Sequence, residues 1–294
     1  MGNYRQAIDE YKYMLDAFPQ HTYVRNDIAK LHCRMGEYGK AIAYYSKEIE
    51  RKRNKLNSFS SIKRLVKNGE HMDVENELMR LMCELADVYR QAGDYESAER
   101  NYRIVLKRWG NVIYPKISVK PILKIIEYYR DKGELAAARS LVKKIYQRVD
   151  NDELMTRVSK DIHFTETTVY YELGDTLNAK LKGKVYLAQL EKYNGTIDEI
   201  LSDARYKPMY LYDIGIIKLC MGEIDEAERY ISQIVDCRQC VMCECAECFE
   251  YYFGMGLIAE SRGRKEEAAE LYEKAIELKG DYPCAKRHLN MCRQ

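Results

Sequence analysis

A repeated helix-turn pattern constrains this 294-residue chain more than any other feature of its sequence. In the clearest copy, Gly263 is followed five, nine and twelve residues later by Ala268, Tyr272 and Ala275, which places the three side chains on one face of a helix. The same glycine-to-alanine frame recurs at Gly36/Ala41, Gly93/Ala98, Gly133/Ala138, Gly174/Ala179 and Gly222/Ala227. A fixed internal frame of this kind predicts an array of similar structural units.

Each of these glycines ends an apolar-periodic stretch, where a residue with positive φ can terminate one helix and let the next fold back antiparallel. Small residues precede the glycines by seven positions and would let the two helices of a pair approach closely: Ala29, Ala86, Gly215 and Gly256. Only 5 prolines occur in the chain. The sequence therefore predicts an all-α protein made of antiparallel helix pairs.

The pattern resembles the tetratricopeptide repeat family. The residues that carry the resemblance are Ala29, Gly36, Tyr38 and Ala41 in one copy and Gly256, Gly263, Ala268, Tyr272 and Ala275 in another. The resemblance implies a right-handed superhelical solenoid over residues 1–294, with about six full repeats. Residues 1–20 would form a partial first repeat and residues 281–294 a C-terminal capping helix.

The repeat length is uneven along the chain. Ala7 and Ala41 are 34 residues apart, the standard length, whereas Ala41 and Ala98 are 57 apart. We therefore expect a helical insertion at residues 53–76, with one or two helical turns followed by a turn at Asn68-Gly69. The copies around Gly133 and Gly174 are degenerate, with Ile126 and Thr167 at the small-residue position and Gly183 where an aromatic residue is usual.

The chain begins with the second helix of a pair, so we expect either a segment cut from a longer protein or a degenerate cap. No apolar run reaches the ~18 residues that span a bilayer, and the start MGNYRQAIDE lacks the layout of a secretory signal. We expect a cytoplasmic protein with no membrane association. The ten cysteines are therefore interpreted as reduced thiols.

The first helix of each pair should line an inner, concave groove, which is where the resemblance places an extended peptide. Counting from each turn glycine, the predicted groove residues are Asn26, Lys30, Arg34, Arg80, Asp87, Arg90, Glu127, Arg130, Phe164, Tyr171, Tyr212 and Phe253. The N-terminal half of this set is polar and mostly basic, and the C-terminal half is aromatic. A peptide with acidic groups at one end and apolar anchors at the other would fit it. The alternative is that these residues form solvated faces and helix packing.

A cysteine-rich stretch could hold a metal ion. Cys237, Cys240, Cys243, Cys245 and Cys248 include pairs at a spacing that suits tetrahedral zinc. Cys245 and Cys248 also fall on the packed face of the following helix, and cysteine is often buried as a small hydrophobe. Packing is therefore the preferred interpretation, with zinc as the alternative cofactor.

Other functional classes have little support. The 48 basic and 46 acidic residues nearly cancel, and the basic run from Arg51 to Lys67 has no aromatic platform, which argues against nucleic-acid binding. The five histidines are scattered and no phosphate loop or nucleophile turn is present, so we expect no catalysis. The sequence predicts a protein- or peptide-binding scaffold. The alternatives are a peptide-sensing domain of a cytosolic bacterial regulator and an accessory domain of a larger enzyme such as a glycosyltransferase.

Overall fold

The computed structural model describes residues 3–19, 21, 23–61, 68–111, 119–148, 152–236, 247–280 and 282–294. Within these ranges the chain forms fifteen α-helices and one 3₁₀ helix, with no strand. Close contacts between Cα atoms divide the chain into two compact units, residues 1–124 and 125–294, which are described separately. The continuity of one solenoid over all 294 residues stays a prediction.

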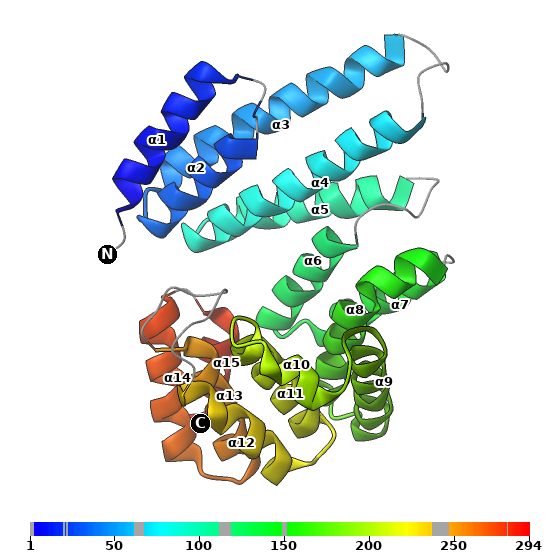
Figure 1. Ribbon diagram of the computed structural model, residues 1–294, viewed down its shortest axis with the longest axis vertical. Helices are drawn as coiled ribbons and strands as arrows, with labels where there is room; N and C mark the ends of the chain where they lie inside the picture. The colour runs from blue at the N-terminus through cyan, green and yellow to red at the C-terminus, as the bar shows by residue number, and fades with distance from the viewer. Residues whose placement is uncertain are drawn as a thin grey trace. The chain divides into compact units, whose positions relative to one another are not determined.

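Unit 1 is a stack of antiparallel helices that follow one another along the chain (Figure 1). A single helix comes first and two full pairs follow, after which the beginning of α6 completes the unit. The helices are α1 (Tyr4–Ala17), α2 (Tyr23–Arg34), α3 (Tyr38–Ser61), α4 (Asn68–Gln91), α5 (Tyr95–Asn111) and α6 (Lys120–Asp131).

Unit 2 continues the alternation of first and second helices and contains one short additional helix. Its first helices are α6, α8, α11 and α13, and its second helices are α7, α9, α12 and α14. The bounds are α7 (Leu135–Arg148), α8 (Asp152–Glu172), α9 (Thr176–Asn194), α10 (Ile197–Ser202), α11 (Lys207–Cys220), α12 (Ile224–Ser232), η1 (Gln233–Asp236), α13 (Phe249–Ser261), α14 (Lys265–Lys279) and α15 (Pro283–Cys292).

All six predicted turn glycines lie between the two helices of a pair, with φ between 72° and 82°. At each turn the residue after the glycine donates its backbone N–H to a carbonyl five residues earlier, which is the hydrogen bond of a Schellman motif. The six donor and acceptor pairs are Glu37/His32, Asp94/Tyr89, Glu134/Tyr129, Asp175/Tyr170, Glu223/Lys218 and Arg264/Ala259. The glycines are required because an L side chain at positive φ is strained.

The small and aromatic anchors lie where the repeat pattern predicts. Ala29, Ala41 and Tyr45 in the first full pair are almost completely buried, as are Ala268 and Tyr272 in the last. A Cβ atom placed on Gly215 would lie 2.4 Å from Cγ1 of Ile231, so α11 and α12 touch at a contact that admits no larger residue. Close approach of this kind is the physical reason for small residues at these positions.

The predicted insertion lengthens two existing helices. Both α3 and α4 contain 24 residues, and the residues from 53 to 61 continue α3. Asn68-Gly69, which we expected to form a turn, instead lie in the first turn of α4. The long helices pack against each other, and Lys52 of α3 pairs with Glu77 of α4. Tertiary packing therefore overrides a local turn signal here.

The degenerate repeat around Gly174 is completed by two features that its sequence pattern did not predict. A Cβ on Gly183 would lie 2.7 Å from Cγ of Met221, the residue that follows α11, so the absence of an aromatic side chain at Gly183 leaves room for this methionine. The additional helix α10 begins at a capping box in which Thr196 and Glu199 each bond the other's backbone. This helix accounts for the lengthened step between the repeats around Ala179 and Ala227.

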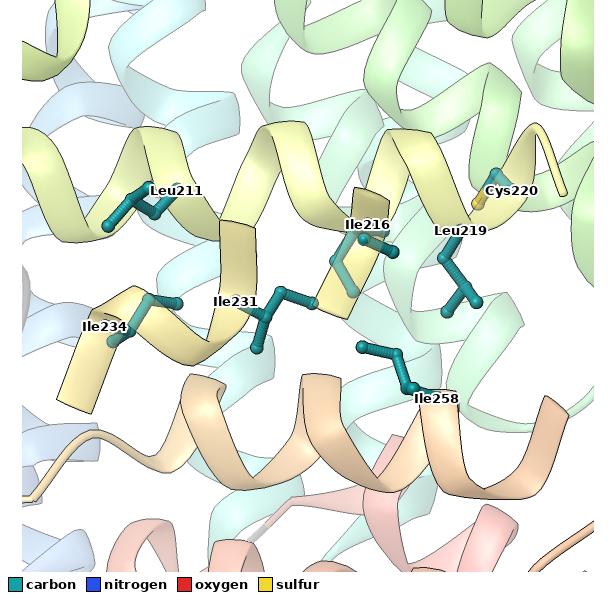
Figure 2. Close-up of a cluster of buried hydrophobic side chains, with 8 residues drawn as sticks. Leu211, Ile216, Leu219, Cys220, Ile231, Ile234 and Ile258 are labelled. Atoms are coloured by element: carbon teal, nitrogen blue, oxygen red, sulfur yellow. The ribbon is translucent and has the colours of Figure 1, made fainter. Parts of the chain in front are cut away.

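The core of unit 2 includes a cluster of buried side chains between α11, α12 and α13 (Figure 2). Leu211, Ile216 and Leu219 of α11 face Ile231 of α12 and Ile258 of α13. Each buried aliphatic side chain contributes about 1.5–3 kcal/mol to folding. The cluster holds the α11/α12 pair against α13. The sides of these helices that face away from it are left for other contacts.

No helix in the described ranges is both long and apolar enough to cross a membrane.

Candidate functional site

The predicted groove residues of unit 1 fall on the first helices α2 and α4, but they differ in exposure. Asn26 is only 6% exposed, and its side-chain oxygen is buried with no hydrogen-bond partner among the described residues. Lys30 and Arg34 are exposed one and two turns further along α2, and Lys30 lies 3.5 Å from Asp27. The exposed part of this face therefore begins at Lys30.

A charged cluster joins α4 to the beginning of α6. Lys124 of α6 donates to Glu84 at 3.0 Å and to Asp87 at 2.9 Å, and Asp87 also accepts a hydrogen bond from the Tyr102 hydroxyl. Burial alone would lower the pKa of Lys124, but the attraction of Asp87 and Glu84 outweighs it and raises this pKa above its usual value. Asp87 is therefore held in an internal network.

The thiol of Cys33 connects this cluster to α2. Burial, together with the negative charges of Glu84 and Asp87, raises its pKa to about 11, so the thiol lies within the electrostatic range of these two carboxylates. Side chains of α2, α4 and the beginning of α6 thus meet on one polar surface, which we call the unit 1 face. Arg80 of α4 reaches it with a side chain that is 39% exposed and a long 3.9 Å pair with Glu77. Arg90 lies half-buried near the end of the same helix.

In unit 2 the predicted residue Arg130 is part of a buried ionic triad. Its Nε and Nη2 donate to Oε1 of Glu172 at 3.1 and 2.5 Å, and Nη2 of Arg287 donates to Oε2 of Glu172 at 2.5 Å. The Glu172 side chain is only 8% exposed. The two arginines lower the pKa of this carboxyl, although burial opposes them. The triad joins α6, α8 and α15. Glu127, also predicted for the groove, is exposed on α6.

The predicted aromatic residues of unit 2 are engaged in internal contacts. Phe253 is 5% exposed and packs against Tyr272, Tyr282 and His288. Tyr212 hydrogen-bonds Tyr282, and Phe164 packs edge-on against Tyr186.

Tyr171 also has an internal partner, because its hydroxyl lies 3.1 Å from Oγ of Ser261. Five of the six groove residues predicted in unit 2 thus lie on first helices and contact other side chains of the protein: Arg130, Phe164, Tyr171, Tyr212 and Phe253.

A tyrosine–carboxylate pairing recurs that the sequence analysis did not find. Tyrosine hydroxyls of second helices donate to carboxylates of first helices at Tyr102/Asp87, Tyr146/Glu166, Tyr186/Asp213 and Tyr272/Glu260. For Tyr102 and Tyr272 the available signal was a tyrosine at the position where the repeat requires an aromatic residue, because phenylalanine would pack equally well. Tyr146 and Tyr186 lie at other positions of their helices, so the repeat pattern gave no signal for them. These bonds hold the carboxylates in place on the first-helix side.

Among these four carboxyl groups, that of Asp213 has a strongly raised pKa. Burial raises its pKa to about 7, while Lys160 and the Tyr186 hydroxyl oppose the shift. Glu250 and Asp161 add repulsion of like charge. Unit 2 therefore contains a buried carboxyl whose pKa lies near neutral pH.

The predicted metal site falls largely outside the described residues. Cys237, Cys240, Cys243 and Cys245 belong to the range that the structure does not describe. Cys248 is described and packs against the cluster in Figure 2. In the described ranges no group of three or more potential metal ligands occurs. Zinc binding by the cysteine stretch stays a prediction.

Comparison with known proteins identifies the repeat. Family models of the tetratricopeptide repeat match residues 1–55, 83–153 and 249–282, which together are more than half of the chain. The Photosystem I assembly protein Ycf3 of Rippkaea orientalis is 32% identical over 112 residues, covering 38% of this chain and 62% of that protein. The match thus spans less than two thirds of this relative's length.

Two solved structures resemble this chain in fold. A tetratricopeptide repeat protein from Parabacteroides merdae has a TM-score of 0.52 at 14% identity, covering 100% of this chain and 93% of the other. BtubC from P. vanneervenii has a TM-score of 0.53 at 15% identity, covering 83% and 91%. At these identities the likeness is one of fold. The family models, which match more than half of the sequence, show that this chain belongs to the tetratricopeptide repeat family.

Proposed function

We propose that this protein is a non-catalytic scaffold that holds a protein or peptide partner, and that the unit 1 face is one of its binding surfaces. Repeat arrays of this family expose successive first helices as extended surfaces for other proteins. The assembly role in the name of the Rippkaea orientalis relative supports the same functional class.

The arrangement of charge on the unit 1 face carries the proposal. The carboxylates of Glu84 and Asp87 already form ion pairs with Lys124 of the same chain. Arg80, on the same side of α4 one turn before Glu84, keeps a partly exposed guanidinium. Guanidinium groups bind carboxylates through paired, charge-assisted hydrogen bonds. The partner is therefore expected to present acidic side chains to α2 and α4.

Affinity purification with quantitative mass spectrometry tests this proposal. The variant Arg34→Glu/Arg80→Glu reverses two charges on the unit 1 face, and we expect it to lose partners that the wild-type protein retains. A matched control is Arg100→Glu/Arg103→Glu, which reverses two exposed charges of the second helix α5. Identical protein sets from the wild type, the face variant and the control would contradict binding at this face.

A further inference from the structure

The C-terminal segment of the chain, residues 282–289, touches every first helix of unit 2 or the turn that follows it. Arg287 reaches Glu172 of α8, and its Cδ lies 3.9 Å from the position of a Cβ on Gly133, after α6. Tyr282 bonds Tyr212 of α11. His288 Nδ1 lies 2.8 Å from Oε2 of Glu260 on α13. We call the surface formed by these partners the unit 2 face.

The segment and the unit 2 face have opposite charge. The face presents the carboxylates of Glu172 and Glu260, and the segment inserts Arg287 and His288 between them. Hydrogen bonds to Cys284 and Glu260 outweigh the effect of burial and raise the pKa of His288 to about 9, so this ring is charged at neutral pH. The two cations of the segment therefore pair with two carboxylates of the face, one of which, Glu172, is shared with Arg130.

The contact between the C-terminal segment and the unit 2 face centres on the buried carboxylate of Glu172, which needs a cation at each oxygen. Arg130 occupies Oε1, whereas Oε2 depends on Arg287. Removing one partner from a buried ion pair is strongly destabilising because the remaining charge is left without compensation. A guanidinium must therefore occupy the Arg287 position whenever the face is closed.

The chain's own arginine fills that position imperfectly. Nε of Arg287 is buried without a hydrogen-bond partner among the described residues, and only Nη2 bonds Glu172. Arg130, in contrast, uses both Nε and Nη2 on the same carboxylate. An unpaired buried donor carries a desolvation cost, so a better placed arginine could compete with Arg287.

We propose that the unit 2 face is a second binding surface, for a protein segment that carries an arginine, and that residues 282–289 occupy it as an internal ligand. The partner's arginine replaces Arg287 at Oε2 of Glu172, and its flanking aromatic residue replaces Tyr282 beside Tyr212 and Phe253. The internal segment lowers the apparent affinity for the partner by keeping the face closed most of the time. This surface is separate from the unit 1 face and its test does not depend on it.

Binding of a labelled peptide with the sequence of residues 282–294 to the full-length protein, followed by fluorescence anisotropy, tests the proposal. The Arg287→Ala protein should bind this peptide about tenfold or more tightly than the wild type, because the internal segment competes less well. Lys286→Ala is the matched control, since Lys286 is the neighbouring exposed cation of the same helix. It should bind the peptide as the wild type does.

Two further variants separate binding from general loosening. Adding Glu172→Gln to Arg287→Ala should abolish the gain, and so should replacing Arg287 by Gln in the peptide. Should Arg287→Ala unfold in circular dichroism, Arg287→Lys keeps the charge without the planar fork and should give a smaller gain. Equal affinities for the wild type and the folded Arg287 variants, or a gain that survives loss of Glu172 or of the peptide's arginine, would overturn the proposal.

Discussion

The ring of Tyr272 lies against Gly256 so closely that a Cβ atom on Gly256 would stand 2.6 Å from Cε1 of the tyrosine. The two residues belong to α14 and α13, the helices of the last pair, and Tyr272 is fully buried. The hydroxyl of Tyr272 donates to Glu260 at 2.5 Å, so the ring is fixed at both ends. Ring and glycine together set the separation of these helices.

Gly256→Ala should therefore destabilise the protein by about 1–3 kcal/mol, because neither the ring nor the backbone can yield without losing contacts. Urea denaturation measures this change. Gly39→Ala is the matched control, because Gly39 lies in the helix α3 with nothing within 4 Å of its Cβ position. That variant should be neutral or stabilising by up to ~1 kcal/mol. A Gly256→Ala protein as stable as Gly39→Ala would contradict the packing described.

Gly93 has open space around its Cβ position but a φ of 82°. Gly93→Ala should cost about 1–2 kcal/mol through backbone strain alone, and Gly93→Asn should cost less because asparagine tolerates the left-handed region better. Thermal unfolding of the two variants checks the order. If alanine were tolerated as well as asparagine, side-chain contacts and not backbone strain would govern this turn.

Because the pKa of Asp213 is raised in the folded protein, we expect stability to fall as pH rises. Its pKa is raised to about 7 in the folded protein, against 3.8 for the ordinary side chain, so between these values the folded state binds the extra proton. The free energy of unfolding should fall as pH rises through this window and level off above about pH 7. Between pH 5.5 and 8 we expect a contribution of about 2 kcal/mol from this group.

Asp213→Asn removes that dependence while its side-chain oxygen can still accept from Tyr186. The difference in unfolding free energy between wild type and variant should change over pH 5.5–8. Asp203→Asn is the control, because its backbone and side-chain hydrogen bonds with Arg205 lower its pKa and keep its titration below this range. Parallel profiles for the wild type and Asp213→Asn would show that Asp213 titrates normally.

His288 contributes to the free energy of unfolding in a higher pH range than Asp213 does. Its pKa is raised from 6.5 to about 9, so its stabilising contribution is fully present below pH 6.5 and is lost as pH rises through 9. The stability lost by His288→Gln should be greatest near pH 6, on the order of 2 kcal/mol, and small at pH 9.5. Chemical denaturation at several pH values measures it, with His21→Gln as a matched histidine control outside unit 2. A pH-independent difference would contradict a charged His288.

The sequence predicted the local part of the architecture because each repeat carries its own signals. Positive φ at Gly36 or Gly263 depends on local chain geometry, and Ala268 and Tyr272 are paired by helical spacing alone. Other local signals failed where packing prevailed. Asn68-Gly69 entered α4, and the additional helix α10 appeared within a lengthened step.

The candidate surfaces were predictable only as helix faces. Turn-glycine counting placed Arg80 and Arg130 on first helices, but it could not show that Lys124 neutralises Asp87 or that Arg130 shares Glu172 with another arginine. Such partners depend on contacts between repeats, and the lengths of the intervening helices decide which residues meet.

By itself the sequence determined an all-α chain of helix pairs, their turns and their small-to-aromatic contacts, because these follow from backbone conformation and from side-chain spacing within about forty residues. Only the tertiary structure decided that Arg287 meets Glu172 across 115 residues of sequence. Nothing in the local pattern encodes that pair. It exists because successive helix pairs bring α15 back to α8, where a buried carboxylate requires a cation.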